Sequence, residues 1–227
     1  MMTNAVNHYC RSSIGRKHLI AITGLALCGF LVGHLAGNFL LMVGPDAFNM
    51  YAHQLVSLGA ALYVIEALLA IAFLVHLGLA VKLTMENRAA RGNQNYHMKV
   101  RTGRGTTIMS QTMPYTGLVL LVFIVLHLIN LKFGTHYDVT TESGVEVRDL
   151  YRLTMEFFSS PGNVIWYCFA MICAGMHTAH GVGSAFQSLG LNHPRYYRKI
   201  VAISYIYAIV IGGGFAFISI WAYLKGV

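Results

Sequence analysis

The chain has 227 residues, of which 56% are hydrophobic and only 11% are charged. Soluble domains carry about 25% charged residues, so this composition excludes an ordinary soluble protein and favours an integral membrane protein. The net charge of +8 does not indicate nucleic-acid binding, because most basic residues stand in short connections between apolar runs, where membrane topology explains them.

Five apolar runs are long enough to cross about 30 Å of hydrocarbon at about 1.5 Å per residue. In chain order they cover about residues 19–43, 60–83, 115–133, 164–189 and 200–224. The first run is too long for a signal peptide and lacks a small-residue cleavage site. The sequence therefore predicts an all-α fold, a single domain over residues 1–227 with five transmembrane helices. We find no internal repeat.

The charged residues are distributed asymmetrically between the two sides of these five runs. One side carries the basic residues Arg11, Arg16, Lys17, Lys82, Arg88, Arg91, Lys99, Arg101, Arg104, Arg195, Arg198 and Lys199. The other side carries the acidic residues Asp46, Asp138, Glu142, Glu146, Asp149 and Glu156. Because Lys and Arg mark the cytoplasmic side, we expect the N-terminus inside and the C-terminus outside.

The four cysteines carry no recognisable ligand motif. Cys10, Cys28, Cys168 and Cys173 show neither CxxC nor CxxCH spacing. This argues against a zinc ribbon, a c-type haem attachment and a thiolate-bound iron-sulfur cluster. We interpret the cysteines as small hydrophobic residues.

Histidines stand inside each of the first four apolar runs and are absent from the fifth. They are His34, His76, His127, and His177 with His180. Ionisable side chains inside a membrane are costly and indicate a functional site. A single membrane histidine is more often a hydrogen-bonded packing residue, but one in each of four consecutive runs favours a shared site.

The predicted orientation assigns a depth to each histidine. His34 and His127 come late in runs that lead outward, so both lie in the outer half of the membrane. His76 and His177 come past the middle of runs that lead inward, so both lie in the inner half. Each pair could supply both axial ligands of a haem iron, which predicts two b-type haems between the first four helices. Zinc fits poorly, because it usually takes three or four ligands at one depth.

Two further features allow alternative interpretations. Gly29, Gly33 and Gly37 recur at four-residue spacing, which favours close helix packing, although the same groove could admit a flat macrocycle. Glu66 lies near the outer start of the second run. It is either a carboxylate stabilised at a helix N-terminus or an acid-base group for a quinone, whose reduction needs protons as well as electrons.

Several segments together resemble a known family. They are "GLALCGFLVGHLAGNFL", "GPDAFNMYAHQL", "VIEALLAIAFLVHLGLAVKL", "TGLVLLVFIVLHLINLKFG" and "HTAHGVGSAFQSLGLNHPR". In order, spacing and sidedness they resemble the five-helix dihaem cytochrome b anchor of succinate dehydrogenases and quinol:fumarate reductases.

This resemblance implies specific ligands and partners. His34 and His127 would hold the distal haem, and His76 and His177 the proximal haem. His177 is preferred over His180 because the family's ligand stands thirteen residues before the glycine of "SLG", here Gly190. The chain would sit in a bacterial cytoplasmic membrane, on a flavoprotein with covalent FAD and an iron-sulfur protein, and would exchange electrons with menaquinone. Dicarboxylate chemistry would belong to the other subunits.

The resemblance also bears on proton transfer. A glutamate similar to Glu66 occurs in related chains, which makes it the candidate quinone or proton residue. Asn38, Asn49, His53 and Gln54 could complete a polar pocket around it or could be loop hydrogen-bonders. Some dihaem fumarate reductases carry a proton-conducting glutamate two residues before the fourth ligand. Here that position is Gly175, so we expect no such route.

Two alternative functions remain open at the level of sequence. A cytochrome b anchor of a hydrogenase or formate dehydrogenase would also show paired membrane histidines. A haem-free transporter could use the histidines for protons or a metal. An absorption spectrum distinguishes the haem-free transporter from either kind of cytochrome b anchor.

Overall fold

The computed structural model describes residues 9, 12–91, 107–191 and 193–226, and these are almost entirely helical. The elements in chain order are α2 (Ser13–Phe39), the 3-10 turn η1 (Leu40–Met42), α3 (Pro45–Ser57), α4 (Ala60–Arg91), α5 (Ile108–His127), the π-helical turn η2 (Leu128–Lys132), β1 (Asp138–Thr140), β2 (Glu146–Arg148), α6 (Leu150–Phe158), α7 (Pro161–Ser188) and α8 (Pro194–Gly226). Of the residues discussed from sequence, Cys10, Arg11, Lys99, Arg101 and Arg104 lie outside the described part.

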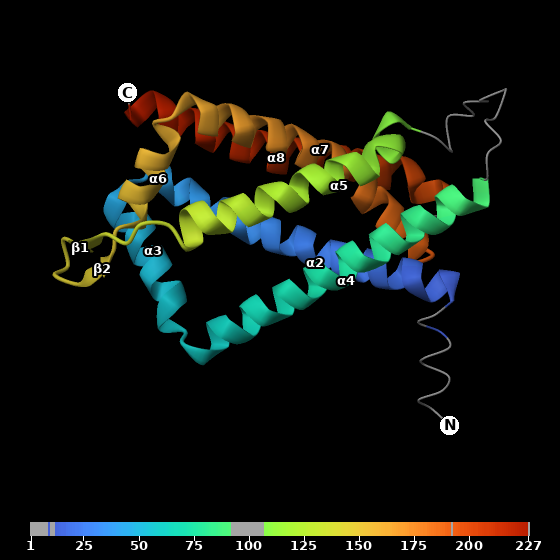
Figure 1. The fold of residues 1–227 in the computed structure, drawn as a ribbon, viewed down its shortest axis with the longest axis horizontal. Coiled ribbons are helices and arrows are strands. Elements are labelled where there is room, and N and C mark those ends of the chain that lie inside the picture. The colour runs from blue at the N-terminus through green and yellow to red at the C-terminus, as the bar shows by residue number, and fades with distance from the viewer. Residues whose placement is uncertain (1–8, 10–11, 92–106, 192, 227) are drawn as a thin grey trace.

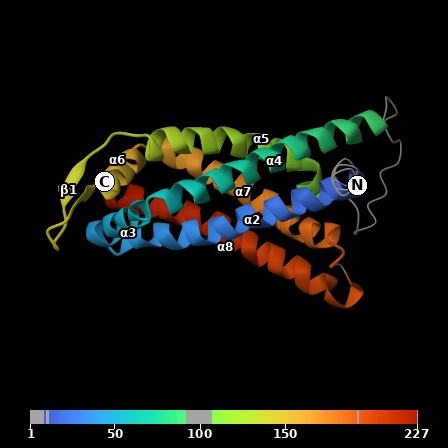
Figure 2. The same ribbon diagram turned by 90° about the horizontal axis from the view of Figure 1, so that it is seen from below.

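Successive long helices alternate in direction, so the molecule has two distinct ends (Figures 1 and 2). One end, which we call the basic end, gathers the starts of α2, α5 and α8 and the last turns of α4 and α7. The other, which we call the capped end, carries α3, the β1–β2 strands, α6 and the C-terminal end of α8. Alternation of this kind is what a polytopic membrane protein with short connections requires.

Four helical segments are long and apolar enough to cross a membrane: Ser13–Met42, Ala60–Ala90, Ile108–Lys132 and Pro194–Gly226. α6 and α7 meet the same criteria when taken together, but a 94° bend separates them. By length and composition the described residues therefore hold four spans, or five if the bent pair forms one.

The long helices start earlier or end later than the apolar runs predicted. α5 begins at Ile108 rather than near residue 115, because Thr107 and Ser110 form a capping box at its start. α4 continues to Arg91 rather than ending near residue 83, since the polar residues that follow are mostly good helix formers. A hydrophobicity pattern alone does not predict helical turns that consist of polar residues.

The described residues are mostly helical, as the all-α prediction requires, and the connection between α5 and α7 adds two short strands. There β1 and β2 pair antiparallel, with Val139 opposite Val147, and Gly144 adopts a φ of 79° in the turn between them. Such positive φ angles favour glycine. The segment then enters α6, which turns through the 94° bend into α7.

Side-chain bonds tie α3 to the rest of the capped end. Asn49 is only 2% exposed. Its amide donates to Asp149 Oδ1 at 2.9 Å, and its carbonyl oxygen accepts from the Tyr151 backbone N–H at 2.8 Å. Asp46 Oδ2 accepts from the Glu142 backbone N–H at 2.9 Å. These contacts hold the start of α3 against the start of α6 and the turn between the two strands.

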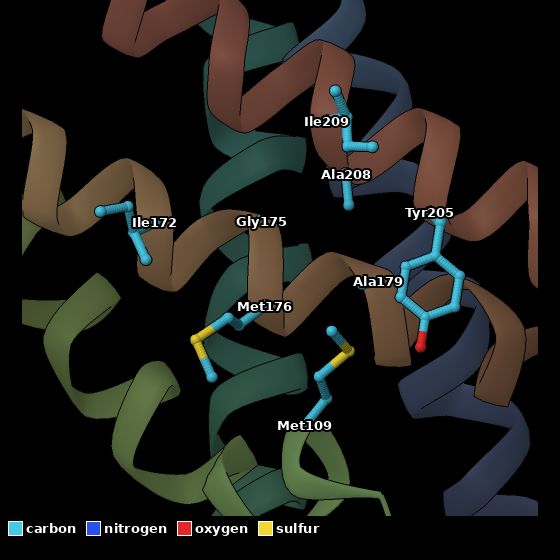
Figure 3. Close-up of a pocket in the computed structure, with 8 residues that line it drawn as sticks. All are labelled: Met109, Ile172, Gly175, Met176, Ala179, Tyr205, Ala208 and Ile209. Carbon is cyan, nitrogen blue, oxygen red and sulfur yellow. The ribbon is translucent and has the colours of Figure 1, made fainter.

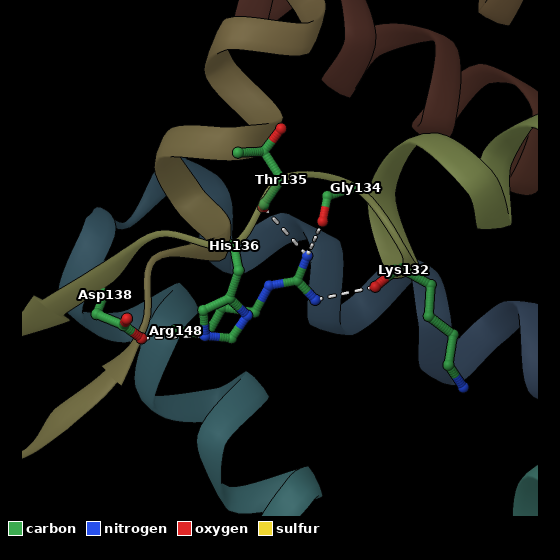
Figure 4. A network of polar contacts seen from close by, with 6 residues as sticks. All are labelled: Lys132, Gly134, Thr135, His136, Asp138 and Arg148. Carbon is green, nitrogen blue, oxygen red and sulfur yellow. Dashed lines mark hydrogen bonds and ion pairs between the residues drawn. The ribbon is translucent and has the colours of Figure 1, made fainter.

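Arg148 caps the end of the α5–η2 segment (Figure 4). Its Nη1 donates to the Lys132 carbonyl at 3.0 Å, and its Nη2 lies 3.3 Å from the carbonyls of Leu131 and Gly134 and 3.5 Å from that of Thr135. The last carbonyls of a helix have no partners within it, so a cation at this position satisfies them and opposes the negative helix end.

The two C-terminal helices pack closely, whereas α4 stands at the edge. A Cβ on Gly212 would lie 2.9 Å from the Met171 carbonyl and 3.3 Å from the Gly175 Cα, so glycine permits the close approach of α7 and α8. In the most apolar window of α4 no residue is buried, and Tyr63 on it is 72% exposed. An apolar helix so exposed is typical of a surface that meets lipid or a bound group.

Candidate haem-binding histidine pairs

Toward the capped end, His34 on α2 and His127 at the end of α5 lie ring against ring. Their ring centroids are 5.8 Å apart and their planes are nearly perpendicular at 89°. These are the two residues that the predicted depths place together in the outer half, and we call them the outer pair.

Nearer the basic end, His76 on α4 and His177 on α7 form a second pair, which we call the inner pair. Their ring centroids are 6.5 Å apart and their planes meet at 61°. Four helices thus contribute one histidine each, in the same two pairs expected from sequence. His180, one turn beyond His177, is half-buried and makes no ring contact or hydrogen bond within the described residues.

The two pairs lie at different levels along the bundle. A Cβ on Gly24 of α2 would lie 3.1 Å from His76 Cε1, and a Cβ on Gly117 of α5 would lie 3.5 Å from His177 Cε1. Gly24 precedes His34 by ten residues, and Gly117 precedes His127 by ten residues. At about 1.5 Å per residue, both helices separate the two levels by about 15 Å.

His76 is held through its Nδ1 by the backbone and side chains of α2. Nδ1 lies 3.2 Å from the Ile20 carbonyl and 3.3 Å from Thr23 Oγ1. A carbonyl oxygen can only accept, so Nδ1 carries the proton in this bond. The lone pair of His76 is therefore on Nε2, the nitrogen that a metal ligand uses when its other nitrogen donates.

His177 is held in the same way by α5. Its Nδ1 lies 3.1 Å from Thr116 Oγ1. The Thr116 hydroxyl already donates to the carbonyls of Thr112 or Met113, at 3.1 and 3.2 Å. It therefore accepts from Nδ1–H, and Nε2 of His177 also keeps its lone pair.

The outer pair has different partners. His127 Nδ1 lies 3.1 Å from the Tyr167 hydroxyl. His34 Nδ1 is 3.5 Å from Asn38 Nδ2, the outer limit of a hydrogen bond, while that amide donates to the His34 carbonyl at 2.8 Å. The ring of His34 is instead stacked on Phe30 with centroids 5.2 Å apart.

The segments that lead to His34 and His127 are a short internal repeat, so the expectation of no internal repeat is wrong. Residues 23–34 read "TGLALCGFLVGH" and residues 116–127 read "TGLVLLVFIVLH". In each copy the threonine and glycine contact an inner histidine, and the final histidine belongs to the outer pair. The phenylalanine four residues before that histidine stacks on it in both copies. This twelve-residue match is the sequence signal that could have identified Thr23, Thr116, Gly24 and Gly117 as neighbours of the inner histidines.

The geometry of both pairs fits an iron between two imidazoles. Metal bonds to imidazole nitrogen are about 2 Å long, so two rings on opposite sides of one metal have centroids about 6 Å apart. The centroid separations of 5.8 and 6.5 Å lie close to this value. Within the described ranges no group of three or more His, Cys, Asp or Glu side chains is placed to share a metal ion.

The glycine ridge of α2 is only partly a packing surface. Gly37 faces the ring of Tyr51, as close packing predicts. Gly29 and Gly33, in contrast, are exposed, and a Cβ on either would meet nothing within 4 Å. Packing between the described helices therefore accounts for Gly37 but not for Gly29 and Gly33, whose surface is open to a lipid or a flat ligand.

Glu66 forms an ion pair that the sequence did not predict. Its carboxylate pairs with the Lys132 ammonium from η2, and both side chains are about 40% exposed. Glu66 stands ten residues before His76 on α4, which places it near the level of the outer pair. Of the polar residues expected nearby, Asn49 belongs instead to the α3–α6 contacts described above.

Comparison with known proteins adds no relative. No family model, no curated protein and no solved structure matches this chain. The resemblance to dihaem cytochrome b anchors therefore remains an interpretation of its motifs, to be considered with the geometry above.

Proposed function

We propose that this chain is a membrane-anchoring dihaem cytochrome b that carries electrons between a quinone and an iron-sulfur partner subunit. The observation that carries the proposal is the arrangement of four helical histidines in two close pairs, about 15 Å apart along the bundle. Each pair offers one iron two axial imidazoles, and a haem so bound supplies reversible one-electron transfer.

The chain's own residues prepare the inner site for such a ligand. Ile20 and Thr116 hold Nδ1 of His76 and His177, which leaves each Nε2 lone pair available to a metal. Gly24 and Gly117 leave room for the two rings between the helices. The outer site uses Tyr167 to orient His127.

For quinone chemistry we propose Glu66 as the acid-base group, with Lys132 as its positioning partner. Reduction of a quinone takes up two protons with two electrons, so a titratable group near the electron donor is required. Glu66 lies near the level of the outer histidine pair and is partly exposed, so it can reach both a bound quinone and interfacial water. Menaquinone is the quinone that the resemblance favours.

We further propose five spans, with α7 as the fourth and α6 lying outside it. The first turns of α2 and α8 and the last turns of α4 carry basic residues at the basic end, namely Arg16, Lys17, Arg88, Arg195 and Arg198. By the positive-inside rule we assign that end to the cytoplasm. The inner pair would then face the flavoprotein and iron-sulfur subunits of a succinate:quinone or quinol:fumarate oxidoreductase in a bacterial cytoplasmic membrane.

The rival functions make different use of the same histidines. A haem-free proton or metal transporter gives no reason for two separate pairs whose Nδ1 atoms are mostly engaged. A cytochrome b of a hydrogenase or formate dehydrogenase would share the haems, and only its partner subunits would separate it from the proposal.

The experiment is a set of paired substitutions scored by bound haem b. His34→Ala and His127→Ala should each remove one haem, and the double variant should remove no more than either alone. His34→Ala combined with His76→Ala should remove both. His180→Ala, the control one turn from His177, should keep both haems. Additive losses within a pair, or full haem content in all variants, would refute the assignment.

A further inference from the structure

We infer that the chain holds one anionic phospholipid, with an acyl chain in an apolar groove between α7 and α8 and the headgroup on Arg195 and Arg198. The inference concerns the lipid-facing side of the molecule and needs neither haem nor quinone. It requires only that these helices lie in a membrane.

The groove is lined almost entirely by apolar side chains from three helices (Figure 3). Its volume is about 220 Å³, and its lining residues are Met109 of α5, Ile172, Gly175, Met176 and Ala179 of α7, and Tyr205, Ala208 and Ile209 of α8. This is below the 300–1,000 Å³ typical of ligand pockets, so it suits a segment of hydrocarbon chain better than a ring system.

The groove opens at the outside of the helix bundle, and its lining can adapt to the shape of a ligand. Ile172 and Ile209 on its rim are 63% and 71% exposed. Met109 and Met176 line it with flexible side chains that adjust to irregular apolar ligands. Gly175 has no side chain, so no atoms beyond the backbone fill the groove at this position between α7 and α8.

A continuous stripe on α8 connects the groove with a cationic site. Arg195, Arg198, Ala202, Tyr205 and Ile209 follow one another at three- and four-residue spacing, so they share one face of the helix. Arg198 precedes Tyr205 by seven residues, about 10 Å along the axis, and lies in the first turns of α8, which begin at the basic end. Ala202 between them presents only a methyl group, which leaves a path for a lipid.

Among the described residues, no carboxylate pairs with the cations at this site. α7 and α8 contain no Asp or Glu. None of the ion pairs in the described residues involves Arg195, Arg198 or Lys199. Arginine binds phosphate with two parallel hydrogen bonds, and basic sites between helices at the membrane surface suit anionic headgroups. Charge therefore selects an anionic over a zwitterionic lipid.

The test is native mass spectrometry of the purified full chain with phosphatidylglycerol or phosphatidylcholine of identical acyl chains. We expect one phosphatidylglycerol to bind about tenfold more tightly than phosphatidylcholine. The double variant Arg195→Gln/Arg198→Gln should lose this preference, whereas Lys82→Gln, which removes a positive charge from α4, should retain it.

A photoactivatable phosphatidylglycerol with a diazirine in its acyl chain locates the tail. Crosslinks should concentrate on Met176, Tyr205 and Ile209. They should fall with Ala202→Trp, which blocks the path, and persist with Ile203→Trp, which lies off the stripe. Equal affinity for the two lipids, an equal effect of Lys82→Gln, or crosslinks spread evenly over all lipid-facing helices would overturn the inference.

Discussion

Each inner histidine has two ring nitrogens with separate tasks. Nδ1 is held by a neighbouring helix, and Nε2 is left for a ligand. The threonines that take part donate their own hydroxyl hydrogens to carbonyls of the preceding turn, which makes them acceptors for the ring. A threonine inside an apolar helix can therefore fix a histidine tautomer without adding a charge to the membrane.

Removing the Thr116 hydroxyl should weaken the inner site without emptying the outer one. In Thr116→Val the His177 Nδ1–H loses its acceptor, and loss of such a partner typically costs about 10- to 100-fold in metal affinity. We expect the haem held by His177 to dissociate at least tenfold faster into apomyoglobin, measured by absorbance. Thr112→Val is the control, because Thr112 donates only to carbonyls of its own helix, and its haem should dissociate at the wild-type rate.

Gly24 should be required for the inner pair on steric grounds. A Cβ there would already lie 3.1 Å from His76 Cε1, and the two methyl groups of Gly24→Val would displace the ring from its position opposite His177. The expected haem content falls from two to about one per chain. Gly78→Val provides the comparison on α4, where a Cβ meets nothing within 4 Å. Equal haem in the two variants would contradict the contact.

At the scale of elements, the α5–η2 segment connects the outer histidine pair with the candidate quinone residue Glu66. His127 ends the α-helix, and the five-residue π-helical turn that follows carries Lys132 to Glu66. Turns of this kind are often found at functional positions. Arg148 bonds the carbonyls at the end of this turn, so a strand of the connection between α5 and α7 stabilises the helix that presents a candidate ligand.

Arg148→Ala should destabilise the capped end. It leaves several carbonyls at the end of η2 without donors, at a cost of about 1–3 kcal/mol for partly buried groups. We expect a lower melting temperature in detergent and a weaker outer haem signal, followed together by absorbance. Arg152→Ala removes a more exposed arginine paired with Glu156 on the same helix and should change the melting temperature little. Equal shifts in both variants would show that the capping contacts contribute nothing specific.

At the scale of the whole molecule, the constant rise of an α-helix explains which features could be predicted from the sequence. Constant rise converts residue number into depth, so the partners His34 with His127 and His76 with His177 followed from sequence. Helix limits in polar turns, the β1–β2 hairpin and the Glu66–Lys132 pair did not, because they depend on capping and on contacts between distant segments. The repeat at residues 23–34 and 116–127 was visible in sequence, but its meaning required knowing that its threonines and glycines face histidines.

The proposed topology predicts which ends of the bundle reach each side of the membrane. In a variant without its four cysteines, Ser143→Cys in the β1–β2 turn should react with a membrane-impermeant maleimide in intact cells. Arg88→Cys, near the end of α4, should react only after the cells are lysed. The reverse pattern would invert the orientation, and reaction of both in intact cells would exclude an odd number of spans between them.

The most direct test of the central claim is the haem content of the purified wild-type protein. Two histidine pairs, each with a ring separation that suits one iron, predict two b-type haems per chain in a pyridine haemochrome assay, with a reduced-minus-oxidised spectrum of bis-histidine ligation. A chain that is folded, contains all four histidines and binds no haem after expression with sufficient haem supply would contradict the account.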